Sequence, residues 1–126
     1  MNESNNHFTP ADWHTITPRI VVHQAKELVD FIKQVFGGAG DFHTDMPSII
    51  SIGDSRIMIS EVGVRESTPA FLYVYVEDAD ETYRRALDAG ARSIEETCNT
   101  PYGDRRATVE DPFGNTWQIA TYKNQG

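Results

Sequence analysis

The amino-acid sequence repeats one pattern of a strand, an amphipathic helix and further strands. A strand-like run, Arg19-Ile20-Val21-Val22, precedes an apolar stripe with helical spacing that ends at Gly37. The members of this stripe are Leu28, Phe31, Ile32, Val35 and Phe36. In the second half, the run 71–76 leads into a helical pattern with Tyr83, Ala86 and Leu87 on one face, which ends at Gly90. Such a repeat predicts the α+β fold class, with two tandem βαβββ modules that form a curved mixed sheet around a cavity.

The repeat divides a single domain, 1–126, into two modules. We expect module one over about 13–62, a linker over 63–69 and module two over about 70–122. In module one, we expect a strand over 17–22 and a helix over 26–36, followed by two or three strands over 42–45, 48–52 and 56–61. In module two, we expect a helix between Asp78 and Gly90, a loop over 98–104, and strands over 70–76, 92–95, 106–110 and 116–122. Asp78 has the chemistry of a helix cap, and Glu81 is placed to bond back toward it.

The composition argues against several classes of partner. The formal net charge of −8, with no basic cluster, disfavours binding to nucleic-acid phosphates. No apolar stretch approaches the roughly 20 residues needed to span a bilayer, and the polar segment 1–7 lacks the order of a secretory signal. Cys98 is the only cysteine, so an internal disulfide is impossible and a reducing compartment is favoured. We therefore expect a cytoplasmic protein without a nucleic-acid or membrane partner.

Two motifs in the second half are specific enough to indicate a family. They are Tyr102-Gly103-Asp104-Arg105 and Asp111-Pro112-Phe113-Gly114-Asn115-Thr116-Trp117. Together with the runs 17–22 and 74–80, they resemble the vicinal oxygen chelate superfamily of glyoxalases, bleomycin-resistance proteins and extradiol dioxygenases, most closely its PhnB-like branch. The resemblance covers 13–122 and implies the paired-module fold and a homodimer. It does not fix the activity, because this fold hosts lyases, isomerases, oxygenases, thiol transferases and binding proteins.

The resemblance also implies where a metal would bind. Enzymes of this superfamily hold a divalent ion with four side chains, two from each module, on the concave face of the sheet. The corresponding positions here are Thr17, Met58, Phe71 and Gln118. Of these, only Gln118 offers a usual ligand for a hard ion, whereas the Met58 thioether suits soft ions. We therefore expect no metal and no other cofactor, and whether the chain is an enzyme stays open.

Strand alternation predicts an aromatic lining in place of a metal site. Phe71, Tyr73 and Tyr75 alternate along one strand and share the face turned away from the helices. On the last strand the same alternation turns Trp117 toward the helices and Gln118 toward the cavity. Aromatic rings in such a row are typical of a site for a ring-bearing or cationic organic molecule. The alternative interpretation is that the rings are buried against a partner chain or by the protein's own side chains.

The sequence thus yields one set of candidate ligand-binding residues. They are Thr17, Arg19, Met58, Phe71, Tyr73, Tyr75, Arg105 and Gln118. The aromatic members are expected to stack on the ligand, while Thr17, Arg19 and Gln118 orient it. Arg19 suits a ligand carboxylate or phosphate, or else an acidic neighbour at the strand edge. Either Arg105 or its neighbour Arg106 is expected to extend into the cavity.

Three functional hypotheses follow from these observations. The first is a metal-free protein that binds a small aromatic or cationic organic molecule. The second is a metal-dependent lyase, isomerase or dioxygenase of the glyoxalase type, whose ligands lie elsewhere in the chain. The third is an interaction module with a vestigial cavity. The missing metal ligands, the aromatic strand face and the acidic composition favour the first hypothesis.

Overall fold

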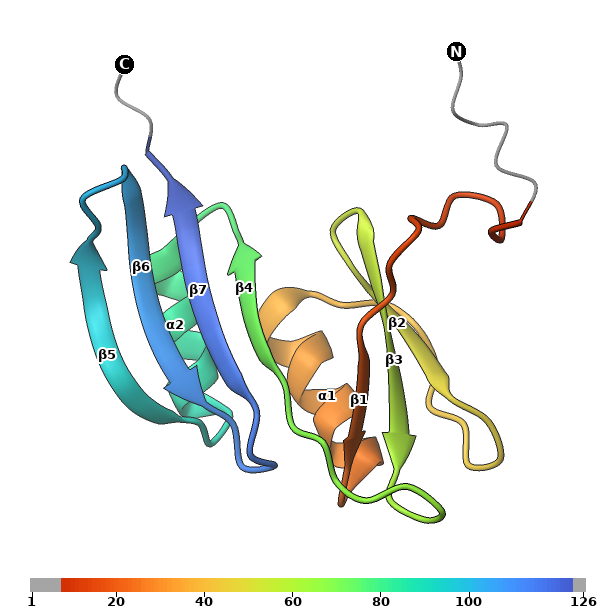
Figure 1. The fold of residues 1–126 in the computed structure, drawn as a ribbon. Coiled ribbons are helices and arrows are strands. Elements are labelled where there is room, and N and C mark those ends of the chain that lie inside the picture. The colour runs from red at the N-terminus through yellow and green to blue at the C-terminus, as the bar shows by residue number, and fades with distance from the viewer. Residues whose placement is uncertain (1–7, 124–126) are drawn as a thin grey trace.

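The computed structural model describes residues 8–123, which form two modules of similar topology (Figure 1). The first contains β1 (Arg19–Val22), α1 (Ala25–Phe36), β2 (Ser48–Ile52) and β3 (Ser55–Glu61). The second contains β4 (Phe71–Tyr75), α2 (Ala79–Asp88), β5 (Arg92–Asn99), β6 (Asp104–Glu110) and β7 (Thr116–Tyr122). The predicted α+β class with repeated strand–helix–strand modules is confirmed. No helix within residues 8–123 is both long and apolar enough to cross a membrane.

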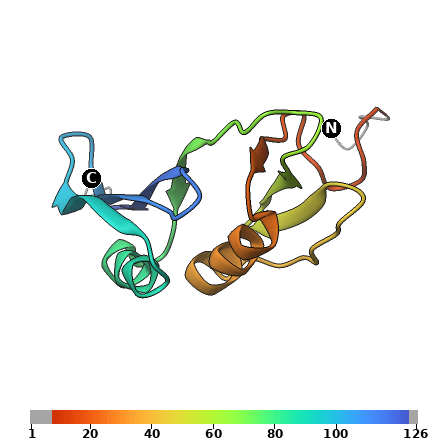
Figure 2. The ribbon, with the colours of Figure 1, turned by 90° about the horizontal axis from the view of Figure 1, so that it is seen from below.

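Each module builds its own mixed sheet. The strand orders are β1-β3-β2 and β4-β7-β6-β5, and in both sheets the first strand runs parallel to the last strand of its module. Seen from below, α1 and α2 lie next to each other on the same side of the two sheets (Figure 2). The other face of each sheet therefore carries no helix. We call these two surfaces the open faces.

The strand predicted over 42–45 does not form, so the first sheet has three strands where the repeat predicted four. In the segment between α1 and β2, only Ala39 pairs with a strand. Its N–H and C=O both bond to the backbone of Ser51 in an isolated antiparallel bridge. Gly40 follows with φ of 139°, and a Cβ at this position would lie 2.3 Å from the carbonyl oxygen of Ile49. The backbone thus passes too close to β2 for a side chain at this position. Within 42–45, the N–H of His43 bonds to the Ser48 hydroxyl (2.8 Å) and not to a backbone carbonyl of β2.

The strands of the second sheet extend beyond their predicted limits. β5 continues to Asn99 and β6 begins at Asp104, so the predicted loop over 98–104 shrinks to a short turn. Cys98 consequently lies in a strand, opposite Arg106. The pairing of β5 with β6 contains register shifts, which interrupt the simple alternation that sequence reasoning relies on.

The core lies between the helices and the sheet faces that they cover. α1 buries the predicted stripe, with Leu28, Ile32 and Val35 fully inaccessible. Trp117, on the helix side of β7, is also 0% exposed, and its ring contacts Phe36 at a centroid distance of 5.0 Å. Because Phe36 belongs to the first module and Trp117 to the second, the core is continuous between them.

The motif that begins at Asp111 is a hydrogen-bonded turn between β6 and β7. Asp111 is 3% exposed, and one carboxylate oxygen accepts the backbone N–H groups of Phe113 (2.8 Å) and Asn115 (2.9 Å). The other oxygen accepts from the Asn115 side chain (2.9 Å) and from the Trp117 indole (2.8 Å). Asn115 in turn accepts the N–H of Ala70 at the entrance to β4 (2.8 Å). The motif therefore has a structural role, joining the turn to the core and to the first strand of the module.

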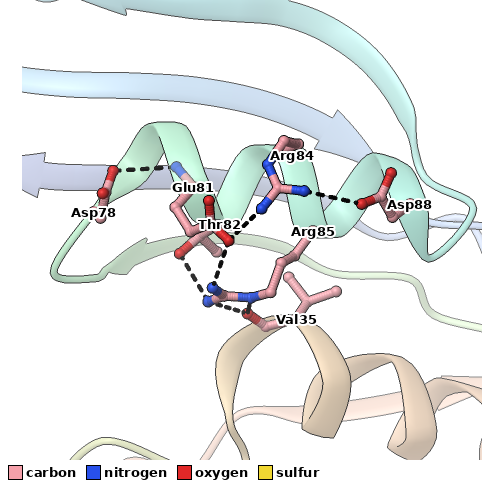
Figure 3. A network of polar contacts seen from close by, with 7 residues as sticks. All are labelled: Val35, Asp78, Glu81, Thr82, Arg84, Arg85 and Asp88. Carbon is pink, nitrogen blue, oxygen red and sulfur yellow. Dashed lines mark hydrogen bonds and ion pairs between the residues drawn. The ribbon is translucent and has the colours of Figure 1, made fainter.

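A polar contact between the helices adds to the apolar one (Figure 3). Arg85 of α2 donates from Nε and Nη2 to the Val35 carbonyl oxygen near the end of α1, at 3.2 and 3.0 Å. At the start of α2, Asp78 accepts the N–H of Glu81 at 3.1 Å, as predicted. The second half of the predicted capping box is wrong, because the Glu81 carboxylate pairs with Arg84 and Arg85.

Candidate ligand-binding site

The open face of the second sheet carries a row of exposed aromatic rings. Phe71, Tyr73 and Tyr75 are 68%, 36% and 59% exposed, while Leu72 and Val74 between them pack against the core. This confirms the predicted alternation along β4. Gln118 of β7 pairs with Tyr73 in the ladder and therefore shares its face. The rings of Tyr73 and Tyr75 are tilted against each other, with their centroids 5.4 Å apart.

A buried carboxylate anchors two of these rings. Asp104, at the start of β6, is 2% exposed, and its Oδ2 accepts from the hydroxyls of Tyr73 (2.6 Å) and Tyr75 (2.9 Å). Burial of the hydroxyl and the bond to Asp104 raise the pKa of Tyr73 far above its usual value. The bond to Asp104 is the main cause that raises the pKa of Tyr75. Both phenols are therefore neutral donors at ordinary pH, with their rings held in place.

The polar contacts continue across the open face. The hydroxyl of Tyr102 lies 3.3 Å from that of Tyr73 and accepts from Arg106 Nη1 at 2.7 Å. Arg106 also donates to both carboxylate oxygens of Glu95, each at 3.2 Å, and this contact lowers the pKa of Glu95. Thr108 donates to Glu95 at 3.0 Å and accepts from Gln118 at 3.4 Å. A continuous hydrogen-bonded chain thus links the tyrosines to Gln118.

Arg105 does not belong to this surface, and its placement among the candidate site residues is wrong. It lies opposite Thr121, on the side of the sheet that α2 covers, and its guanidinium pairs with Asp80 of α2. Arg106, the neighbour that the sequence also offered, is the arginine on the open face. The physical reason is the strand period of two, which sends adjacent side chains to opposite faces.

The candidates from the first module lie on or beside the open face of the other sheet. Arg19 pairs with Met58 in the ladder and donates from Nη2 to the Ser60 hydroxyl at 3.1 Å. No ion pair of Arg19 occurs within residues 8–123, so its charge is available to solvent. Thr17 precedes β1 by two residues and is half-buried. Arg19 lies apart from the tyrosines, since it borders a separate depression formed with Val64, Arg65, Glu66 and Thr68 of the linker.

A cleft of about 320 Å³ opens between the modules. Its lining residues are Pro18, Ile52, Gly53, Asp54, Ser55 and Ile57 from the first module and Leu72, Tyr73, Val74, Tyr75 and Trp117 from the second. The turn between β2 and β3 thus faces β4 across this space. Tyr73 and Tyr75 border both the cleft and the open face, so they are the predicted site residues that the structure brings to one cavity. Its volume is suited to a small organic molecule.

The donor set at the expected metal positions does not fit a divalent ion. Thr17, Met58 and Phe71 offer no carboxylate or imidazole, and Gln118 donates its amide to Thr108. Within the described part of the chain, no three His, Cys, Asp or Glu side chains come together in a way that would hold a metal. Two carboxylates on this face, Asp104 and Glu95, are already bonded to tyrosines and to Arg106.

Sequence reasoning missed three contributors to this surface. They are Glu95, Tyr102 and Asp104. A signal for Asp104 was present, because Asp104 has the strand-face spacing of Arg106 and Thr108, and the turn at Asp111 fixes the pairing of this strand with β7. Glu95 lies beyond a register shift, and Tyr102 lies in a turn, so neither position follows from alternation.

Fold and site together define a paired-module protein with an intermodule cleft and an aromatic sheet face. The model of the Glyoxalase/Bleomycin resistance protein/Dioxygenase superfamily matches residues 6–119, and the chain belongs to this superfamily. An uncharacterized protein of Mycobacterium bovis is 26% identical over 122 residues, which cover 82% of this chain and 80% of that protein.

Several solved structures share the fold at low sequence identity. TioX from Micromonospora sp. ML1 has a TM-score of 0.68 and 21% identity, and the match covers 85% of this chain and 98% of TioX. A glyoxalase/bleomycin resistance protein/dioxygenase family enzyme from Burkholderia phytofirmans has a TM-score of 0.71 and 21% identity, covering 82% and 94% of the two chains. The fosfomycin resistance protein FosX from Mesorhizobium loti has a TM-score of 0.64 and 15% identity, covering 86% and 91%. At these identities the likeness concerns the fold alone.

Proposed function

We propose that this chain is a binding protein for a small ring-bearing organic molecule, which it holds in the intermodule cleft without a metal. The observation that carries the proposal is that Tyr73 and Tyr75 border a cleft of about 320 Å³ while Asp104 fixes their hydroxyls. Rings held in this way lose little conformational freedom when a ligand stacks on them. The donor set at the expected metal positions supports a metal-free mode of binding.

The ligand is expected to lie with one face against the tyrosines. Its apolar edge would contact Ile52, Ile57 and Leu72 in the cleft, because these aliphatic side chains line the wall beside the rings. Its polar edge would face Gln118 and Thr108 on the open face. A mainly apolar cavity with a few polar groups at one side is the usual design of a small-molecule site.

A titration with para-tert-butylphenol and beta-naphthol tests this function, with heat of binding as the measurement. The wild-type chain is expected to bind at least one of these rings, and Tyr75→Ala is expected to weaken that binding about tenfold while the circular dichroism spectrum is unchanged. Tyr83→Ala is the matched control, because Tyr83 lies on α2 and its hydroxyl contacts Ser93. Unchanged affinity in Tyr75→Ala would remove the stacking role, and no heat with either ring would contradict the proposed function.

We further propose that the chain belongs to the PhnB-like branch, acts in the cytoplasm and forms a homodimer. The motifs at 102–105 and 111–117 support the assignment to this branch. The single thiol of Cys98 supports a reducing compartment such as the cytoplasm. The dimer is supported by the 68% exposure of Phe71 on an open face, which a second chain would cover. Light scattering coupled to size-exclusion chromatography should give the mass of two chains. A monomer at all accessible concentrations would contradict the dimer.

A further inference from the structure

Four tyrosines surround the buried carboxylate of Asp104. Two of them, Tyr73 and Tyr75, donate to it directly. The hydroxyl of Tyr102 lies 3.3 Å from that of Tyr73, and Tyr122 is the residue paired with Asp104 in the ladder between β6 and β7. All four rings are accessible, with exposed fractions between 36% and 63%. We call this group the tyrosine cluster.

The charge of Asp104 has no cationic partner within residues 8–123. The two arginines that follow it in the chain are both engaged elsewhere. Arg105 pairs with Asp80 on the other side of the sheet, and Arg106 pairs with Glu95. Asp104 is therefore a buried carboxylate that is stabilised by phenol donors and forms no ion pair among the described residues.

This arrangement makes the cluster attractive to a positive charge. A phenol that donates to a carboxylate is polarised by it, and the electron density of its ring rises. The negative faces of such rings attract an ammonium group that lies over them. The buried charge of Asp104 adds a long-range attraction, because the low-dielectric surroundings screen it less than water would.

The same arrangement offers little to an anion. The hydroxyl protons of Tyr73 and Tyr75 are directed at Asp104, so they are not available to a ligand carboxylate or phosphate. The guanidinium on this face, Arg106, already donates to both oxygens of Glu95 and to Tyr102. An anionic group would meet the field of Asp104 without a free donor to offset it.

We propose that the tyrosine cluster selects a ligand with a quaternary or tertiary ammonium group, for which Asp104 is the buried counter-charge. The inference rests on the proposed function and names the ligand class of the same site. It makes the ligand a ring-bearing cation. The ammonium group would lie over Tyr75 and Tyr102, while the ring extends into the cleft bordered by Tyr73.

Three phenols of nearly equal shape separate charge selection from ring binding. In para-hydroxyphenyl trimethylammonium, para-tert-butylphenol and para-hydroxybenzenesulfonate, one ring carries a cationic, a neutral or an anionic substituent of similar size. Titration calorimetry of the wild-type chain should show the cation binding about tenfold more tightly than the neutral phenol. The anion should bind more weakly than both.

Asp104→Asn tests the counter-charge, and Asp80→Asn is its matched control. Both variants remove one negative charge, but Asp80 lies on the α2 side of the sheet and contacts Arg105. The preference for the cation is the dissociation constant of the neutral phenol divided by that of the cation. We expect this ratio to fall to nearly one in Asp104→Asn and to stay at about ten in Asp80→Asn. If Asp104→Asn does not fold, Tyr75→Phe replaces it, since this change keeps the ring and removes the bond that polarises it.

The outcomes separate the two proposals. Equal binding of the cation and the neutral phenol, or tighter binding of the anion, would overturn the ammonium selectivity and leave the ring-binding function standing. A preference that persists unchanged in Asp104→Asn would also overturn the role of the buried carboxylate. Absence of binding by all three phenols would contradict the proposed function, and the selectivity with it.

Discussion

At the scale of single residues, Tyr73 shows how a sheet surface controls the ionisation of a phenol. Its pKa is raised by burial of the hydroxyl and by the bond to Asp104, so the neutral form is favoured in the folded chain. In the unfolded chain a tyrosine ionises near pH 10. The contribution of Tyr73 to the free energy of unfolding is therefore fully present below about pH 10 and is lost as the pH rises further.

This linkage predicts a difference in alkaline stability. The wild-type chain should lose more stability than Tyr73→Phe between about pH 9 and about pH 11, because the variant has no phenol to ionise at this site. Urea unfolding at both pH values, followed by circular dichroism, measures the two losses. Tyr83→Phe serves as the control, since that hydroxyl contacts Ser93 and no carboxylate. Equal alkaline losses in Tyr73→Phe and the wild type would contradict the coupling to Asp104.

Asp111 is a second residue whose effect follows from its partners. Its carboxylate accepts four donors, among them the indole of Trp117 and the backbone N–H of Asn115. Asp111→Ala leaves these buried donors unsatisfied, so the free energy of unfolding should fall by about 3 kcal/mol. Glu110→Ala, one position earlier, removes only a solvent-exposed contact with Arg92 and should cost less than about 1 kcal/mol. Urea titrations of the two variants give the comparison, and similar losses would refute the role assigned to the turn.

At the scale of elements, α1 begins without a cap of its own. Gln24 precedes it in the left-handed region, with φ of 65°, and its side chain makes no capping bond. Glu61, the last residue of β3, accepts the N–H groups of Gln24 (3.2 Å) and Ala25 (2.9 Å) instead. A carboxylate from β3 thus accepts the free N–H groups at the start of α1 and lies at the positive end of the helix dipole.

Removal of this carboxylate should destabilise the helix start. We expect Glu61→Ala to lower the free energy of unfolding by about 1 kcal/mol, which is the usual effect of losing an N-terminal cap. Glu27→Ala is a suitable control, because Glu27 lies in the first turn of α1 and has only the weaker interaction with the helix dipole. Chemical unfolding measures both. If Glu61→Ala and Glu27→Ala lower the free energy of unfolding equally, the two hydrogen bonds from Glu61 contribute nothing beyond the interaction of its charge with the helix dipole.

The elements also show what the sequence could predict. Periodicity located both helices and most strands, because the apolar stripe of α1 and the alternation along β4 are local patterns. It failed at 42–45, where the His43 N–H bonds to the Ser48 hydroxyl and the backbone pairs with β2 only through the bridge from Ala39 to Ser51. The cap from Glu61 has no local signature either, since its partners lie 36 and 37 residues away in the chain.

For the candidate site, too, the sequence predicted what local alternation determines and not what depends on distant contacts. The aromatic row follows from the strand period, and the structure places it on the open face. The choice between Arg105 and Arg106 required the register of β6 against β7, which only the pairing supplies. The role of Asp104 depended on contacts between segments far apart in the chain, because Tyr73 and Tyr75 of β4 lie 31 and 29 residues before it.

At the scale of the whole molecule, the position of the site depends on how the modules are joined. The cleft takes its walls from the turn between β2 and β3 and from β4, so its width follows the relative placement of the two sheets. The helices contribute two contacts between the modules on the far side of the sheets. One is the packing of Phe36 on Trp117, and the other is the pair of bonds from Arg85 to the Val35 carbonyl (Figure 3). Ligand binding and module contact should therefore be coupled.

Arg85→Ala tests this coupling against Arg84→Ala. Arg85 satisfies a carbonyl at the end of α1, where the helix has no further donors, whereas Arg84 makes only exposed ion pairs with Glu81 and Asp88. We expect Arg85→Ala to lower the free energy of unfolding by about 1–2 kcal/mol and Arg84→Ala by less than about 1 kcal/mol. Arg85→Ala should also weaken the binding of para-tert-butylphenol, because the cleft loses one of the contacts that set its width. Urea unfolding and calorimetry measure the two effects, and a destabilised Arg85→Ala that keeps full affinity would show that the cleft does not depend on the contact between the helices.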